Sequence, residues 1–300
     1  MQKSVLPERK IRQYAPQVDE KFTQEARTAV AVNSDFDWEG VGAVKVYSND
    51  VSALNDYKAT GTNRYGTPDE LGNHTQTMLV SQDKSFTFTI DQKSYDDTMM
   101  TMEAGAALAR ELREVVIPFI DKYRLQRMVN AVGSTAIGTI SKTTAYDALL
   151  DAQAALDTAM APADGRIAYV SNAFYKALKQ DDSFIKASDI AMDMRLSGQL
   201  GECDGIAIMK GTGILPEKVN FIVTHPIATT AAQKLESYNI HQNPPGLNGW
   251  LVEGRIRFDA FVRYNKKGAI YVHATSALTA DNSCKLDEEL KAAAAAGSKG

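Results

Sequence analysis

Residues 84–112 read KSFTFTIDQKSYDDTMMTMEAGAALAREL, and the hydrophobic period changes within this stretch. From Lys84 to Ile90 the apolar side chains alternate with Ser and Thr, which is the period of a half-buried strand. After residue 94 the apolar residues recur every three or four positions, which is the period of a helix. The stretch therefore predicts a strand that leads directly into a long helix.

The predicted helix carries a single apolar stripe. Its members are Met99, Met102, Ala106, Ala109, Leu112, Val116, Phe119 and Tyr123. A charge on this stripe, as in Leu112→Asp, is expected to prevent folding. Pro118 removes one helical hydrogen bond, so a kink or a restart is expected near it. Asp96 and Asp97 stand where the helix begins, and we interpret them as helix caps rather than catalytic carboxylates.

The composition is that of an ordinary globular protein. The chain has 300 residues and a formal net charge of −4, so no basic surface indicates nucleic-acid binding. No apolar run approaches the roughly 20 residues that cross a bilayer, and the N-terminus lacks the apolar core of a secretory signal. Cys203 and Cys284 are far apart in sequence and outside any metal-ligand spacing, so we interpret them as free thiols in a reducing compartment.

Before residue 84 the sequence predicts too little regular structure for this part to form a compact unit within a monomer. Residues 1–35 are polar and charged, with one amphipathic stretch over 18–32 that is long enough for a short helix. A strand-like piece over 40–48 is followed, up to residue 76, by a stretch rich in Gly, Asn, Asp and Thr without clear secondary structure. Such long loops are uncommon in compact domains, and they are usually functional, disordered or held by a partner.

Beyond residue 144 helices and strands alternate. Helices are predicted over 145–160, 172–181 and 227–238, and short buried strands over 165–171 and 219–226. Residues 250–274 alternate, turn at 265–268 and alternate again, which predicts a hairpin. The alanine-rich tail is of low complexity.

No pattern of catalytic or ligand-binding residues stands out. The sequence has no GxxxxGK[ST] phosphate loop and no GxSxG nucleophile motif. Its histidines, with no i, i+4 pair and no neighbouring cysteine, are His74, His225, His241 and His273. We therefore expect no catalytic residue, no cofactor and no metal site, and we do not expect an enzyme.

The order of these parts resembles the major capsid proteins of tailed bacteriophages, which have the Hong Kong 97 phage capsid fold. Several stretches are similar to that family in amino-acid sequence: TFTIDQKSYDDT, VIPFIDKYRLQRM, APADGRIAYVSNAFYKALKQDDSF, GECDGIAIMKGTGI and NGWLVEGRIRFDAFV. The resemblance spans about residues 15–275. It rests on the order of parts, because no single residue is diagnostic.

The resemblance implies an α+β fold with named regions. These are an N-terminal arm that reaches over a neighbouring subunit (1–35), an extended two-stranded loop laid across an adjacent subunit (36–92), a peripheral domain with a long spine helix (93–165), an α/β axial domain (166–249), a peripheral-domain hairpin (250–280) and a flexible tail (281–300).

The resemblance also implies a structural protein. Its hexamers and pentamers would assemble into an icosahedral head shell that encloses packaged double-stranded DNA without binding it specifically. A separate scaffolding protein and a portal protein would be its partners, no membrane would be involved, and the virion capsid would form in the host cytoplasm. The implied subunit-interface residues are Tyr57, Lys58, Arg64, Tyr65, Asp69, Glu70, Asn243 and Asn248. Lys58, Lys84 and Lys93 are loop lysines that an inter-subunit cross-link could use, but no local pattern selects one.

Two alternatives remain open. A cellular nanocompartment shell of the same fold would differ in its cargo-docking surface, which one sequence does not reveal. An α/β enzyme could instead use the long loop as an active-site lid. Such a lid should close over titratable groups, whereas this loop lacks a Gly-flanked hinge beside a credible acid, base or nucleophile.

Overall fold

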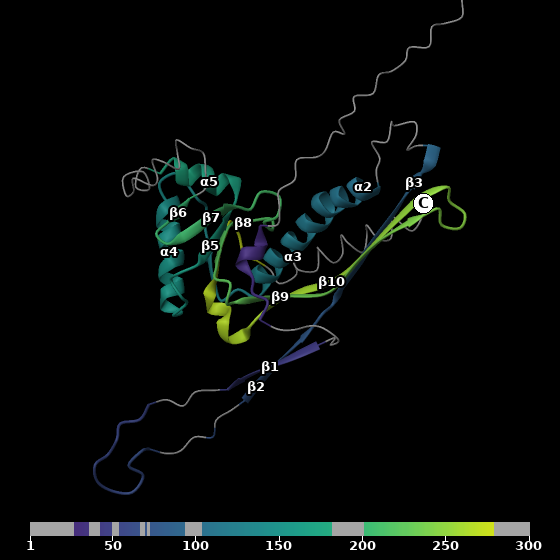
Figure 1. Cartoon of the computed structure of the whole chain (residues 1–300). Coiled ribbons are helices and arrows are strands. Elements are labelled where there is room, and N and C mark those ends of the chain that lie inside the picture. Colours follow the sequence, from purple (N-terminus) through teal and green to yellow (C-terminus); the bar gives the residue numbers. More distant parts are fainter. Residues whose placement is uncertain are drawn as a thin grey trace, which may run out of the picture.

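The computed structural model describes residues 27–35, 43–49, 54–66, 70, 73–93, 104–181 and 201–278. Their strands form three sheets, of six, three and two strands. Figure 1 shows the six-stranded sheet with its helices at one end, a long sheet that extends away from it, and a narrow ribbon that projects from the junction. Helices and strands both contribute, so the predicted α+β class is confirmed.

The six-stranded sheet has the strand order β4-β11-β8-β5-β7-β6. Its strands are β4 (Ser134–Ile137), β5 (Arg166–Val170), β6 (Glu202–Cys203), β7 (Ile206–Lys210), β8 (Val219–Thr224) and β11 (Ile270–Ala274). β5, β8 and β11 are buried at every position, as expected for strands that are covered on both faces.

Different helices cover the two faces of this sheet. On one face α4 (Ala145–Thr158) and α5 (Asn172–Lys179) pack against side chains such as Phe221. On the other face Leu125 and Met128 pack against side chains such as Ile222. The predictions of strands over 165–171 and 219–226 and of helices over 145–160 and 172–181 are confirmed, with small shifts at the ends.

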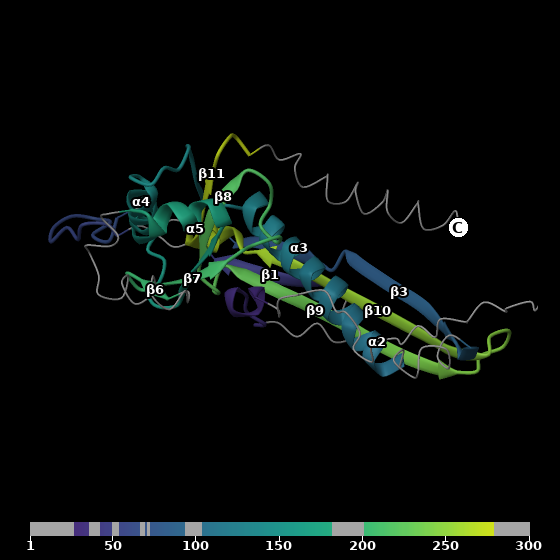
Figure 2. The same ribbon diagram turned by 90° about the horizontal axis from the view of Figure 1, so that it is seen from above.

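The long sheet is antiparallel, with the order β3-β10-β9. Its strands are β3 (Gln82–Asp91), β9 (Thr229–Gln242) and β10 (Gly249–Val262). A helix lies along one face of this sheet, as Figure 2 shows, and consists of α2 (Ala104–Glu111), the π-helical turn η2 (Leu112–Val116) and α3 (Ile117–Asn130). The predicted strand over 84–90 that precedes a long helix is confirmed.

The interruption of this helix coincides with Pro118. The N–H of Ile117 bonds to the carbonyl of Leu112, five residues earlier, and Pro118, the second residue of α3, has no N–H to donate. The backbone stays helical through this point, so the predicted kink or restart takes the form of a change from π to α hydrogen bonding. A π turn holds about one residue more than an α turn, so the apolar face before it moves by about one position.

This shift corrects part of the predicted stripe. Val116, Phe119 and Tyr123 do face the sheet, where they pack with Ile256 and Phe258. Further back the face is made by Ala104, Ala107 and Leu108, whereas Ala106 and Ala109 are exposed and Leu112 is only half-buried. Met99, Met102, Asp96 and Asp97 lie outside the described residues.

Two predictions for the C-terminal half are wrong. Residues 229–238 of the predicted helix 227–238 lie in β9, where long-range pairing with β10 outweighs the helix propensity of their alanines. The predicted hairpin over 250–280 does not form, because β10 pairs with β9 and β3 whereas β11 pairs with β4 and β8. The segment between them is the 3₁₀ helix η3 (Tyr264–Ala269). β10 forms its hairpin with β9 instead, so the predicted boundary at residue 249 falls inside one hairpin.

Gly254 in β10 leaves room for an aromatic ring of the neighbouring strand. A Cβ atom at this position would lie 2.3 Å from Cζ of Phe86, which also contacts Phe88 and Tyr238. We expect Gly254→Ala to lower the free energy of unfolding by about 1–3 kcal/mol, because this ring row must move. Urea unfolding of the variant and the wild type measures this change in the free energy of unfolding. Gly105→Ala on the exposed side of α2 meets no atom within 4 Å and is the control, with an expected small gain. Equal stability of Gly254→Ala and wild type would contradict the prediction.

Candidate assembly surfaces

Residues 54–66 form a folded tip that projects away from both larger sheets (Figure 1). The N–H of Lys58 donates to the carbonyl of Arg64 at 2.9 Å, and the N–H of Gly66 donates to Asn63 at 3.0 Å. Gly61 has a φ of 96°, in the left-handed region that glycine adopts without strain. The tip therefore has a backbone conformation of its own.

The side chains of this tip are exposed. Tyr57 and Tyr65 stack edge to face with ring centroids 5.1 Å apart, yet they are 57% and 84% exposed. Leu54 is fully exposed. Tyrosine is enriched among residues that anchor protein interfaces, because it offers a large apolar area at a low cost in conformational entropy. The tip has the composition of a contact surface.

A two-stranded ribbon connects the tip to the body. β1 (Ala43–Asn49) pairs antiparallel with β2 (Asn73–Leu79). Val44, Val46 and Met78 face inward and pack near Ala232 and Phe261. The ribbon thus has one packed face at its base.

Among the described residues, the side chains on the other face of the ribbon are exposed. There Tyr47 is 64% exposed and Leu79 is 61% exposed. Sequence reasoning missed both residues, because it placed residues 49–76 in a loop and took the strand over 84–90 as the second strand of the extended loop. The alternation of Thr75, Thr77 and Leu79 with Gln76 and Met78 is the signal that could have identified β2.

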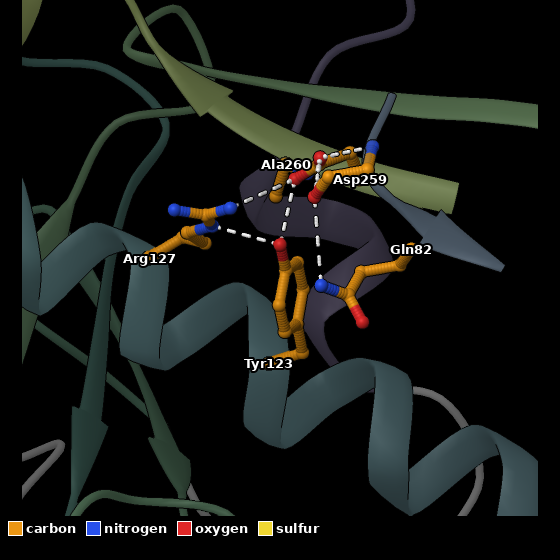
Figure 3. A network of polar contacts seen from close by, with 6 residues as sticks. Gln82, Tyr123, Arg127, Asp259 and Ala260 are labelled. Atoms are coloured by element: carbon orange, nitrogen blue, oxygen red, sulfur yellow. Dashed lines mark hydrogen bonds and ion pairs between the residues drawn. The ribbon is translucent and has the colours of Figure 1, made fainter. Parts of the chain in front are cut away.

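A buried carboxylate holds the base of the ribbon (Figure 3). Oδ2 of Asp259 accepts hydrogen bonds from the N–H of Ser81 at 2.9 Å and from its Oγ at 2.8 Å. Oδ1 accepts from the hydroxyl of Tyr123 and from the N–H of Ala260, both at 2.8 Å. Nη2 of Arg127 lies 3.6 Å from Oδ1, which places a positive charge beside the carboxylate.

Residues 27–35 make contacts within their own subunit. Asp121 of α3 accepts from the N–H of Arg27 at 2.9 Å and from the hydroxyl of Thr28 at the start of η1 (Thr28–Ala31). Tyr169 donates to the carbonyl of Arg27 at 2.7 Å, and Asn33 forms an isolated bridge with Thr230. The part of the predicted arm that the structure describes therefore packs on its own chain. Residues 1–26 of that arm lie outside the described residues.

The predicted interface residues fall at two distant places. Tyr57, Lys58, Arg64 and Tyr65 are exposed on the tip, and Glu70 is exposed beyond it. Exposed too are Asn243 and Asn248, in the β9–β10 turn at the opposite end of the subunit (Figures 1 and 2). Asp69 lies outside the described residues. Of the candidate cross-link lysines, Lys58 lies on the tip, Lys84 lies in β3 and Lys93 follows β3.

The turn with Asn243 and Asn248 has a well-defined geometry. Oδ1 of Asn243 accepts from the N–H of Gly249 at 3.1 Å, and the N–H of Asn243 donates to the carbonyl of Gly249 at 2.7 Å. The carbonyl of Asn248 accepts from the N–H of Gln92 at 2.9 Å, which ties the turn to the end of β3. The turn is thus held by its own side chain and by the neighbouring strand.

The described residues offer little for catalysis or metal binding. Within these ranges no group of three or more His, Cys, Asp and Glu side chains could hold a metal ion. No helix in the described part of the chain is long and apolar enough to span a membrane. Cys203 is a free thiol, as predicted, and burial with the nearby charge of Asp204 raises its pKa to about 12, which keeps it protonated. Cys284 lies outside the described residues.

Comparison with solved structures gives matches over nearly the whole chain. A chain of Mycobacterium phage Che8 has a TM-score of 0.71 at 18% identity, covering 90% of this chain and 97% of that chain. The capsid of the cyanophage P-SCSP1u also gives 0.71, at 12% identity, covering 90% and 94%. A virus-like particle from Pyrococcus furiosus gives 0.54 at 13% identity, covering 84% and 92%. No protein-family model and no curated protein matches the chain. The chain has the fold of tailed-phage capsid proteins, as the sequence resemblance predicted.

Proposed function

We propose that this protein is a major capsid protein whose hexamers and pentamers form an icosahedral shell around packaged double-stranded DNA. The observation that carries the proposal is the match to phage capsid structures. In each match, 90% or more of this chain and of the other chain is covered. A shared fold alone does not give a function. The exposed surfaces of this chain supply the second argument.

The tip and the outer face of the ribbon support a contact with another copy. Tyr57 and Tyr65 on the tip, and Tyr47 and Leu79 on the ribbon, all expose large side chains. Exposed apolar surface of this kind marks interaction sites, because burying it releases about 25 cal/mol per Å². A projection whose outer side chains are not covered by the described residues of its own chain is suited to lie across an adjacent subunit.

The regions of the proposed shell subunit follow the sheets. We assign residues 43–79 to the extended loop, and the long sheet with α2, η2 and α3 to the peripheral domain and its spine helix. The six-stranded sheet with α4 and α5 would be the axial domain. β3, which the sequence placed in the extended loop, belongs to the long sheet by its pairing with β10. A scaffolding protein, a portal protein and assembly in the host cytoplasm complete the proposal.

The arrangement of the tip favours this function over an enzyme with a lid. A lid closes over a pocket, whereas residues 54–66 project away from both larger sheets in Figure 1. A nanocompartment shell has weaker support, because the Pyrococcus furiosus particle matches at a TM-score of 0.54 and the phage structures reach 0.71.

Electron microscopy of the purified protein tests the proposal. We expect closed particles tens of nanometres across, or rings of subunits that close when a scaffolding protein is added, and a matching early peak in size-exclusion chromatography. Particles isolated from the natural host should contain nuclease-protected double-stranded DNA. A monomer or dimer that stays unassembled at high concentration would contradict a shell, and closed particles filled with protein cargo would favour the nanocompartment.

A further inference from the structure

The ribbon and the long sheet separate at a short branch point. β2 ends at Leu79 and β3 begins at Gln82, so only Val80 and Ser81 lie between strands of two different sheets. The direction in which the ribbon leaves the body depends on the backbone of these residues. Anything that fixes Ser81 therefore also restricts the ribbon and the tip.

One carboxylate fixes this branch point to two other elements. Asp259 lies in β10, its side chain is 1% exposed, and its two oxygens receive four hydrogen bonds. Two of these come from Ser81, one from Tyr123 in α3 and one from the adjacent Ala260. The long sheet, the helix and the start of the ribbon are thereby joined at a single buried group.

The pairing of β10 with β3 places Asp259 at this point. The last pair of that antiparallel ladder joins Phe258 to Gln82, so the next residue of β10, Asp259, comes opposite Ser81. Glu253 and Arg255 of the same odd-numbered series are exposed, whereas Asp259 is buried. The register shift beside it lies in β9, because Arg257 pairs with Leu235 and Phe258 with Gln233, and β10 itself keeps its alternation.

Arg127 completes the arrangement by orienting the tyrosine. Its Nε donates to the hydroxyl oxygen of Tyr123 at 2.8 Å, so the hydroxyl proton is left to bond Asp259. Burial and the neighbouring Asp259 raise the pKa of Tyr123 to about 12, which keeps that proton in place. The guanidinium also lies over the tyrosine ring, 5.1 Å from its centroid.

We propose that Asp259 is a positioning residue for shell assembly, which sets the direction of the ribbon and its tip in the subunit before another copy binds. The inference rests on the proposed function for its role in assembly. A projection that is already held in one direction loses less conformational entropy when it docks. Without Asp259 the ribbon remains attached, because Met78 and Val80 are buried in an apolar cluster with Ala232. Apolar contacts of this kind are not directional.

Asp259→Asn removes hydrogen bonds at the branch point and leaves the packing around it nearly unchanged, because the two side chains have nearly the same size. A carboxylate offers two acceptor oxygens, whereas an amide offers one and adds two donors. Asparagine therefore cannot accept from both Ser81 and Tyr123. Ser81→Ala is a milder variant at an exposed residue that removes one bond and cannot leave a buried group unpaired in the core.

Hydrogen exchange on unassembled subunits, followed by electron microscopy, tests the proposal. We expect the amides of residues 73–81 to exchange about tenfold faster in Asp259→Asn, because bonds to a charged acceptor are lost. The amides of β8 in the other sheet should keep their wild-type rates. Ser81→Ala should change the same amides in the same direction by less, and both variants should give fewer and less regular closed particles.

The alternatives are distinguishable. Unchanged exchange of residues 73–81 in both variants would overturn the proposal, and so would an equal increase in β8, which indicates general loss of stability. Faster local exchange with a normal particle yield would overturn the role in assembly. Failure of the wild-type protein to form any particle would overturn the proposed function instead, because exchange measures the branch point without a shell.

Discussion

Replacing residues 56–65 by a short Gly-Ser linker abolishes closed particles and leaves the subunit folded: this is the expected result. The tip contributes no packed side chain to the body, since all its described side chains up to residue 65 are exposed. Its two ends also lie side by side, because a Cβ atom on Gly66 would be 2.8 Å from the side chain of Asn55. The linker therefore closes the gap without strain, and the free energy of unfolding should change by less than about 0.5 kcal/mol.

Circular dichroism with urea unfolding checks the fold of this variant, and electron microscopy checks the shell. The matched control is the double variant Tyr57→Ser, Tyr65→Ser, which keeps the length of the loop and removes the two exposed rings. It should lower the particle yield less than the linker does. Normal particles from the linker variant would refute the assignment of this segment to an inter-subunit contact.

Leu125→Asp should give no folded subunit. Leu125 is fully buried on α3, among the side chains that join this helix to the six-stranded sheet. An isolated carboxylate in this cluster has no partner and leaves a cavity, so the loss should exceed about 4–5 kcal/mol, which is a large share of the stability of a typical domain. Expression in the insoluble fraction and loss of the cooperative urea transition are the measurements.

Leu112→Asp is the control for this variant on the same long helix. The stripe deduced from the sequence placed Leu112 in the core, but it is half-buried in the π turn and belongs to none of the apolar clusters of the described residues. Its carboxylate can reach water, so the variant should fold with a smaller loss of stability. A subunit with Leu125→Asp as stable as one with Leu112→Asp would mean that α3 is not anchored as described.

The parts of the fold that were predictable from the sequence are those with a local cause. The alternation in β3 and the spacing of apolar residues in α4 both lie within a few residues. Strand partners lie far apart instead. The alternation of β10 and β11 is visible in the sequence, but nothing local states that they belong to different sheets. β9 is misread for the same reason, because its alanines favour a helix until β10 supplies the pairing.

The candidate contact surface also has a part that was predictable from the sequence and a part that was not. The tip was identified because its polar, glycine-containing sequence cannot build a core, and the tyrosines within it are visible. Asp259 has no signal in the sequence, since its neighbours Phe258 and Ala260 describe an ordinary strand. Its importance comes from Ser81, 178 residues earlier, and from Tyr123, 136 residues earlier. Only the folded chain brings these groups together.

The distance in sequence between Ser81 and Asp259 also sets when the bond between them can form during translation. A ribosome adds roughly 5–20 residues per second, so roughly 10–35 s pass between the synthesis of Ser81 and that of Asp259. During that interval β3 has no strand to pair with and the ribbon has no fixed direction. A nascent chain therefore cannot present its projection in the finished geometry until residue 259 has been made, and in the proposed shell a chain shorter than this would not yet be ready to dock on another subunit.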